Sequence, residues 1–509
     1  MDNEPPTFIA LRRVALPYEK ISDFDKKLHA VTTEVTVLAN DHATADEVAG
    51  LFETYFENND VINVIVKKGV LNNELHHTLN TVADDQEAME VVSETFDLTK
   101  PNHMYVVQRK QLLHDAWLST ERVMFFRDAD ASKTAIRALD RWVYTTDVLR
   151  SARADRPADS ARRTRFPPGP AYHIVLSVVH PSPDKLHVDF DAGEIMEDYI
   201  GSFVDELTLL HNFTLKSQWL HLLEYDFQVQ KVTDKSEWSR HWAARVHNLP
   251  LLLTRLEERA ATHVSEWPTI NLALYAVPCQ KAPIHIYDKY DQKISAATEA
   301  FLSAKWGGVV IGNPTFGECR EEFEGKTTVS TYKPAVRIIM GTFVAQLREL
   351  LGFVKMESIE GAYLDPLRSV SPRRWELDAL LRTRTVEQLT SAELTLRSLS
   401  QLLGEISNIV INDDVGASIK SSVDSIEKSY ELLSRGDLVE AYQSSQGAFV
   451  AAEAAFMDQS LLALLYFPDD QKYAIYIPLF LPIMFPVILS LKNLWLWMRG
   501  ASTKKEKKD

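Results

Sequence analysis

The stretch YAIYIPLFLPIMFPVILSL, Tyr473–Leu491, contains nineteen consecutive residues without a formal charge. As an α-helix it would be about 28 Å long, close to the roughly 30 Å hydrocarbon thickness of a bilayer. Tyrosines stand near its beginning, and Trp495 and Trp497 follow its end. Aromatic residues at both ends are typical of a membrane-spanning helix. The sequence therefore predicts one transmembrane helix over residues 471–498.

Three prolines in this stretch, Pro478, Pro482 and Pro486, recur every four residues and so lie near one face of the helix. A helix buried in a soluble core is the less favoured alternative, because such helices rarely carry interior prolines. Each proline lacks a backbone N–H and leaves the carbonyl four residues earlier without its helical partner. Lipid offers no donor, whereas a neighbouring helix does. We expect this face to pack against another membrane helix, as a subunit of a complex.

Charge predicts the orientation of the helix. Six basic residues follow Leu491: Lys492, Arg499, Lys504, Lys505, Lys507 and Lys508. The acidic residues after Leu491 are Glu506 and Asp509. The positive-inside bias places the C-terminus in the cytoplasm and the bulk of the chain on the opposite side. Residues 499–509 are then a cytoplasmic basic tail. Lys505 and Lys507, fifth and third from the end, fit a dilysine retrieval signal for the endoplasmic reticulum (ER).

The triplet Asn-Phe-Thr at Asn212–Thr214 is an N-glycosylation acceptor if the body of the chain lies in the secretory compartment. Such triplets also occur by chance in most chains of this length. The triplet at Asn313 is excluded because proline occupies its middle position. Asn212 is therefore the predicted glycosylation site.

Composition limits the possible functions. A chain of 509 residues is expected to form two or three domains, and a net charge of −16 argues against a nucleic-acid partner. The only cysteines, Cys279 and Cys319, exclude a four-cysteine metal site and leave one disulfide possible. The protein is predicted to be globular outside the membrane helix.

The first half of the chain is predicted to be mixed α/β. After a juxtamembrane segment, residues 1–20, the first α/β region covers 21–150, with β-branched runs of strand length at Thr33–Ala39, Val61–Gly69 and His103–Arg109. Residues 45–58 have helical spacing between two of these strands. The charged, proline-containing segment 151–170 is predicted to be an exposed linker or long loop.

A second α/β region is predicted over residues 171–370. Its expected strands are Ala171–His180, Leu186–Asp191, Thr269–Pro278, Ile284–Asp288 and Gly307–Asn313. Together the two regions indicate sheets covered by helices. A helix-like segment precedes Asn212.

Residues 371–458 are predicted to form a helical bundle, because apolar residues there follow a helical period. One stripe contains Leu399, Leu402, Leu403, Ile406, Ile409 and Val410; after the predicted turn Asn412–Asp414, a second contains Ile419, Val423, Ile426, Tyr430 and Leu433. Gly436 is expected to end the second helix. The fold class is thus an α/β lumenal region with a C-terminal helical bundle and one transmembrane helix.

No motif of a catalytic, cofactor or metal site is found: there is no nucleophile elbow, phosphate-binding loop or dinucleotide fingerprint. Asp189 and Asp191 would lie on one face of a strand, as in a metal-dependent glycosyltransferase. An exposed strand edge explains two such aspartates more simply. The residues alone therefore predict a membrane-anchored, non-catalytic protein.

The chain resembles the PIG-S family, most strongly in LLALLYFPDDQKYAIYIPLFLP (Leu461–Pro482) and LSQLLGEISNIVINDDV (Leu399–Val415). The likeness extends to Trp375–Leu389, Lys305–Asn313, Tyr287–Phe301, Tyr172–Asp191 and Arg12–Ile21, and so covers nearly the whole chain. It is weaker before Ser151.

The resemblance implies a subunit of the glycosylphosphatidylinositol (GPI) transamidase of the ER, which replaces a C-terminal signal with a GPI lipid. In that family the cysteine–histidine chemistry belongs to the PIG-K subunit, and the other partners are PIG-T, PIG-U and a GAA-type subunit. A non-catalytic subunit without cofactor agrees with the failure to find a site. The family also carries a glycosylated triplet at the place of Asn212. The alternative is a metal-dependent glycosyltransferase-like enzyme of GPI or glycan assembly.

One departure concerns the N-terminus. The family has a membrane helix just before the segment matched by Arg12–Tyr18, whereas eleven residues, MDNEPPTFIAL, precede Arg12 here. A C-terminal span alone would leave the body in the cytosol, which contradicts the charge bias. We therefore expect that the N-terminal membrane helix is missing from this sequence.

Overall fold

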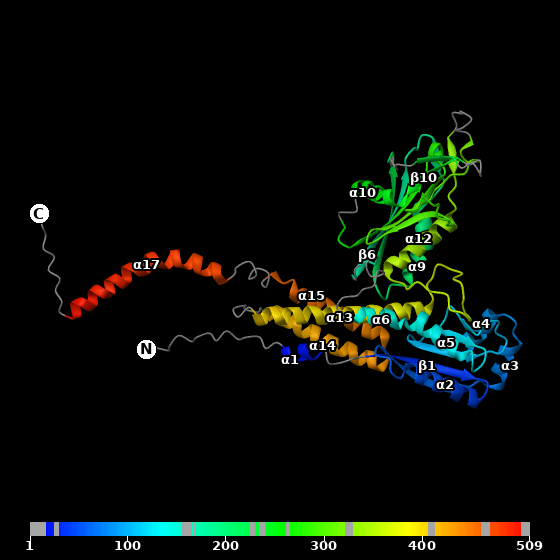
Figure 1. Cartoon of the computed structure of the whole chain (residues 1–509), viewed down its shortest axis with the longest axis horizontal. Helices are drawn as coiled ribbons and strands as arrows, with labels where there is room; N and C mark the ends of the chain where they lie inside the picture. Colours follow the sequence, from blue (N-terminus) through cyan, green and yellow to red (C-terminus); the bar gives the residue numbers. More distant parts are fainter. Residues whose placement is uncertain are drawn as a thin grey trace. The chain divides into compact units, whose positions relative to one another are not determined.

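The structure is a computed structural model. It describes residues 17–24, 30–154, 165–166, 169–223, 230–233, 240–260, 265–320, 329–405, 413–459 and 469–499. The chain divides into two compact units. The first comprises Met1–Lys27, Ser391–Glu427 and Gln446–Asp509, and the second comprises Leu28–Thr390 and Lys428–Ser445. The predicted mixed α/β fold, helical bundle and apolar C-terminal helix are all present (Figure 1).

The first sheet has six strands in the order β16-β4-β5-β3-β1-β2. Four run parallel: β1 (Val31–Ala39), β2 (Ile62–Val70), β3 (His103–Gln108) and β5 (Val123–Phe126). At the edge, β4 (Ala116–Leu118) is antiparallel to β5 and parallel to β16 (Ala362–Leu364). The three strands expected in this region are confirmed. Its helices are α2 (His42–Phe56), α3 (Asn73–Thr81), α4 (Asp85–Thr95), α5 (Ser132–Ala138) and α6 (Thr146–Arg153).

The second sheet has five strands in the order β13-β14-β11-β6-β8. Its parallel strands are β6 (Ala171–His180), β8 (Asn212–His221), β11 (Thr269–Ala276) and β14 (Gly307–Gly312), and β13 (Glu299–Ser303) is antiparallel to β14. Helices α8 (Ala192–Met196), α9 (Ser202–Asp205), α10 (Leu249–Arg259) and α12 (Val336–Leu351) belong to this region. Two smaller sheets are also present among the described residues. In one, β10 (Arg240–Arg245) lies between β12 (Ile284–Tyr287) and β9 (Gln230–Thr233). In the other, β15 (Ser330–Tyr332) pairs with β7 (Leu186–Val188).

The two large sheets have the same strand connectivity. Numbered by their order along the chain, the parallel strands lie in the spatial order second, first, third, fourth in both sheets. In each, the fourth strand also pairs with the antiparallel strand that precedes it in sequence, β4 in one and β13 in the other. This is the arrangement of a doubly wound α/β fold, in which the order reverses beside the first strand. Sequence periodicity indicated the strands but not this shared topology.

Three local predictions need correction. The expected strand Leu186–Asp191 ends at Val188, because Asp191 instead accepts hydrogen bonds as the N-cap of α8. The predicted turn Asn412–Asp414 is partly helical, since Asp413 and Asp414 begin α14 (Asp413–Arg435), while Asn412 lies outside the described residues. Within the expected exposed linker 151–170, Arg165 and Phe166 are buried.

The bundle consists of α13 (Arg374–Glu405), α14 and α15 (Leu438–Phe456), and each helix contributes residues to both units. The predicted α14 stripe is largely correct, since Ile419, Val423 and Ile426 are buried. Serines are buried beside it: Ser422 donates to the Ala448 carbonyl and Ser429 to the Ala441 carbonyl. Of the stripe expected in α13, Ile406, Ile409 and Val410 lie outside the described residues.

Helix α17 spans Asp469–Met498 and contains all three prolines. Its segment Tyr473–Met498 has a mean hydropathy of 2.2, and none of its most apolar window is buried, so it is long and apolar enough to cross a membrane. Figure 1 shows α17 as one continuous, curved helix. Interior prolines bend helices in this way because they remove hydrogen bonds from one face. The basic tail, with Lys505 and Lys507, lies outside the described residues.

Candidate functional site

The first half of α13 is the most heavily charged part of the protein interior. Trp375 is fully buried, and the charged side chains that follow it are at most 5% exposed: Glu376, Asp378, Arg382, Arg384 and Glu387. A charge in the interior is tolerated only when it is paired and hydrogen-bonded. Each of these residues therefore needs a partner on a neighbouring element, and together they form the α13 network.

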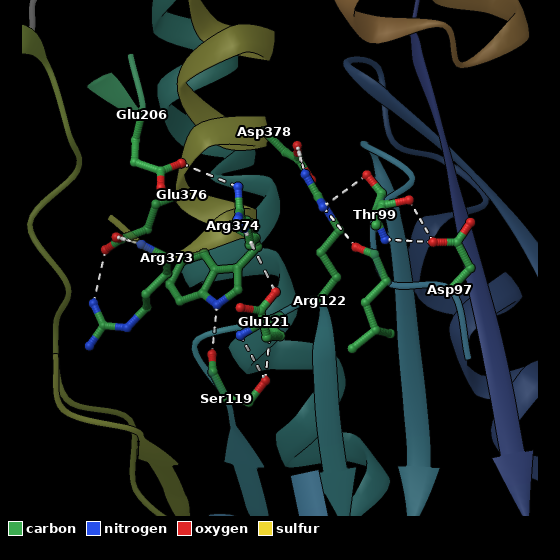
Figure 2. A network of polar contacts seen from close by, with 12 residues as sticks. Asp97, Thr99, Ser119, Glu121, Arg122, Glu206, Arg373, Arg374, Glu376 and Asp378 are labelled. Carbon is green, nitrogen blue, oxygen red and sulfur yellow. Dashed lines mark hydrogen bonds and ion pairs between the residues drawn. The ribbon is translucent and has the colours of Figure 1, made fainter. Parts of the chain in front are cut away.

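On the side of the first sheet, Asp378 is held by Arg122 in a two-pronged ion pair. The Arg122 Nε and Nη2 atoms lie 2.6 and 2.8 Å from the two Asp378 carboxylate oxygens, and Nη1 donates to the carbonyls of Leu98 and Thr99. Figure 2 shows this guanidinium reaching from the residue just before β5 towards α13. A planar guanidinium matches a carboxylate in this way, which fixes the register of the helix on the sheet.

Asn102 is the second link between α13 and the first sheet. Its backbone N–H donates to Asp378, and its side-chain oxygen accepts from Arg382. Its side-chain nitrogen donates to the carbonyls of Thr32 and Gly436. The backbone of Asn102 has a φ of +60°, a conformation that asparagine tolerates better than most residues. Burial lowers the pKa of Arg382, and the nearby Asp378 carboxylate partly offsets this lowering.

Helix α13 also contacts the second α/β region. Glu376 accepts hydrogen bonds from Arg348 on α12, at 2.7 Å, and from Arg373. Arg384 donates to the Leu351 carbonyl at the end of α12. Glu387 accepts from Arg384 and from Arg165. The same helix therefore bonds to both α/β regions through side chains on different faces.

This arrangement is suited to holding elements together and not to catalysis. The three acidic residues Glu376, Asp378 and Glu387 each bind at least one guanidinium at 3.1 Å or less. A buried carboxylate whose oxygens accept hydrogen bonds from guanidinium groups is not open to a substrate. The network was missed in the sequence because a helix buried on every face shows no amphipathic stripe. Its only signal was the density of charge among apolar residues in WELDALLRTRTVEQL.

The predicted glycosylation triplet is accessible. Asn212 and Thr214 are exposed at the start of β8, which is an edge strand among the described residues and pairs there with β6. Phe213, between them, points the other way and stacks on Tyr172. The neighbouring His211 is buried and donates through Nδ1 to the Gly169 carbonyl. Burial, with a smaller effect from Arg384, lowers the pKa of His211 to about 4.

Asp189 and Asp191 are not arranged as a metal pair. Asp191 accepts from the backbone N–H groups of Gly193 and Glu194, and Asp189 lies 3.7 Å from Lys333 Nζ. Within the described ranges, no three His, Cys, Asp or Glu side chains are grouped as a metal site requires.

Cys279 and Cys319 form a disulfide across 40 residues, and both are buried. The sequence left this pairing open. Disulfides persist in oxidising compartments and are rare in the cytosol.

Comparison with known proteins identifies the family. The family model PIG-S, described as "Phosphatidylinositol-glycan biosynthesis class S protein", matches residues 8–500. The chain belongs to the PIG-S family. The resemblance seen in the sequence is thus confirmed over almost its whole length.

Named relatives of this family member come from animals and fungi. The "GPI-anchor transamidase component PIGS" of Bos taurus is 37% identical over 379 residues, which cover 74% of this chain and 66% of that protein. The human protein of the same name is 37% identical over 72% of this chain and 65% of its own length. The "GPI transamidase component PIG-S homolog" of Schizosaccharomyces pombe is 25% identical over 64% and 53%. The chain thus spans slightly less than two thirds of its mammalian relatives.

Proposed function

We propose that the protein is a non-catalytic membrane subunit of the GPI transamidase complex, which supports attachment of GPI anchors to the C-termini of precursor proteins in the ER. The observation that carries this proposal is the family match over residues 8–500, together with the relatives named as components of that transamidase. The pairing of the buried acidic residues with arginines is in keeping with a structural role.

Helix α17 crosses the ER membrane in this proposal, with the bulk of the chain in the lumen and the C-terminus in the cytoplasm. Three features support this orientation. Most of the basic residues that follow Leu491 lie beyond α17, the disulfide Cys279–Cys319 is typical of an oxidising compartment, and the exposed Asn212 is open to lumenal glycosylation. Lys505 and Lys507 would then act as an ER retrieval signal in the cytosol.

The proposed partners are PIG-K as catalytic subunit, PIG-T, PIG-U and a GAA-type subunit. The Pro478, Pro482 and Pro486 face of α17 would contact their membrane helices, because the freed carbonyls on that face need donors. The folded α/β regions would contact lumenal domains of the same subunits. No nucleic-acid partner is expected from the acidic charge.

Co-purification tests the proposal. The tagged protein, extracted from ER membranes in mild detergent, is expected to bring down PIG-K in stoichiometric amount. A variant with both Asp189→Ala and Asp191→Ala is expected to restore GPI attachment in cells that lack the protein, to nearly the wild-type level. Loss of attachment with normal protein amount and normal PIG-K recovery would instead support the glycosyltransferase alternative.

A further inference from the structure

A cavity of about 480 Å³ lies at the amino-terminal ends of β3 and β5, next to α4. Its apolar wall contains Met89, Phe96, Leu98 and Trp117. Among the described residues that line it, no lysine, arginine or histidine is present, whereas four are acidic: Glu90, Asp97, Glu121 and Asp365. The acidic group alone would be an ordinary solvated surface. Asp365 distinguishes this cavity from such a surface, because this residue is largely withdrawn from solvent.

Asp365 is a largely buried residue whose carboxylate lines the cavity and has no partner among the described residues. The residue is only 7% exposed, and it lines the cavity. Its backbone N–H donates to the Leu118 carbonyl, and its own carbonyl accepts from Arg373, but its carboxylate makes no hydrogen bond or ion pair with any residue that the structure describes. Burial raises the pKa of Asp365, against a smaller lowering by Arg368 and Arg373. A carboxylate that is largely withdrawn from water and has no counter-charge in contact would bind an external cation favourably.

Two cations act on this carboxylate from a distance, Arg368 and Arg373. Arg373 donates to the Glu376 carboxylate and to the backbone carbonyl of Asp365. Arg368 is exposed. A second unpaired acceptor, the buried Gln86 side-chain oxygen, also belongs to the lining. The cavity thus presents acceptors that lack donors.

We propose that this cavity binds a primary alkylammonium group. The ammonium would donate hydrogen bonds to the Asp365 carboxylate and the Gln86 side-chain oxygen. Its alkyl stem would lie against the apolar wall, and the faces of Phe96 and Trp117 attract cations. The exposed Glu90 and the half-buried Glu121 would favour entry of cations over anions. This inference stands independently of the proposed function.

Binding is tested on the full-length protein in detergent, in phosphate buffer at neutral pH, by saturation-transfer NMR. The matched probes are n-butylammonium and its neutral analogue n-butanol. The ammonium is expected to bind at least tenfold more tightly, because a charge-assisted hydrogen bond to a buried carboxylate is lost with the alcohol. Equal binding of the two probes, or no detectable transfer at millimolar n-butylammonium, would overturn the proposal.

Variants locate the site. Asp365→Asn keeps the side-chain shape and is expected to weaken n-butylammonium binding at least tenfold, with unchanged n-butanol binding. The matched control Asp130→Asn, on a fully exposed carboxylate, should leave both affinities unchanged. If Asp365→Asn does not fold, Glu121→Gln at the rim is expected to weaken ammonium binding a few-fold. Unchanged binding in the folded Asp365 variant would contradict the assignment.

The source of the ammonium is distinguished by two further probes. Ethanolamine represents a small free amine, and Nα-acetyl-lysine amide represents a polypeptide side chain. The longer apolar stem of lysine matches the four apolar residues of the wall, so the lysine amide is expected to bind more tightly. Tighter binding of ethanolamine would assign the cavity to a small amine instead. Failure of both probes would defeat the inference and leave the proposed transamidase role untouched.

Discussion

Asp378 shows how single residues hold this protein together. It is 2% exposed and accepts hydrogen bonds from Arg122 and from the Asn102 backbone. Removal of one member of a buried pair leaves the other charge without compensation, which is far more costly than loss of an exposed pair. The α13 network therefore depends on both partners of each pair.

Asp378→Ala is expected to lower the free energy of unfolding by about 3–5 kcal/mol, because Arg122 would remain buried and unpaired. The matched control is Arg141→Ala, which breaks an exposed pair with Asp147 and should cost less than about 1 kcal/mol. Urea unfolding of the full-length protein in detergent, followed by tryptophan fluorescence, measures both. A double variant, Arg122→Met with Asp378→Leu, should recover much of the loss. Equal effects of Asp378→Ala and Arg141→Ala would contradict this account.

His211 predicts a dependence of stability on pH. Its pKa in the folded protein is about 4, below the ordinary value of 6.5. Between these values the unfolded chain binds more protons, so its contribution is complete above pH 6.5 and is lost as pH falls to 4. The full difference is about 3 kcal/mol. His211→Asn, which retains a donor for Gly169, should make the loss of stability on acidification shallower. The free energy of unfolding is measured in urea at several pH values between about 4 and 7. The same dependence on pH in the variant and the wild type would refute this.

At the scale of elements, the turn between α14 and α15 depends on Gly436. Its φ is +88°, and an added Cβ would lie 3.4 Å from the Thr32 carbonyl. Gly436→Ala is expected to destabilise the protein by about 1–2 kcal/mol, since L-residues are strained in this conformation. The control is Gly50→Ala within α2, where a Cβ meets no atom within 4 Å. It should be neutral or stabilise by up to about 1 kcal/mol. The melting temperature should therefore fall in Gly436→Ala and stay the same or rise in Gly50→Ala.

Sequence patterns predicted most strands because β-branched runs of strand length are local signals. Strand β6 begins and ends as expected, and Gly436 ends α14 as expected. The α13 network could not be predicted, because the partners of Asp378 and Glu376 lie far away in sequence. The same limit applies to the cavity at Asp365, which three separate segments of the chain line.

The prolines of α17 are predicted to matter for assembly and not for insertion. Replacement of Pro478, Pro482 and Pro486 by leucine restores the helical hydrogen bonds and removes the carbonyls that would accept from a partner. We expect normal membrane extraction but reduced recovery of PIG-K on co-purification. A control with Ile483→Leu and Ile488→Leu keeps the prolines and should assemble normally. Unchanged assembly of the proline variant would remove this role.

At the scale of the whole molecule, the second unit contains two sheets of the same topology, and side chains from both α/β regions bond to the first half of α13. The buried acidic residues of α13 are paired with arginines of both α/β regions. Such pairing is in keeping with the structural role that we propose. Its function depends on the compartment in which the folded regions lie.

Protease protection of the native protein in sealed microsomes tests the central claim most directly, with antibodies against the α/β regions and against the basic tail. The account predicts that added protease removes the tail and leaves the α/β regions intact. It also predicts that glycosidase lowers their mass in the wild type and not in Asn212→Gln. Digestion of the α/β regions together with protection of the tail would contradict it.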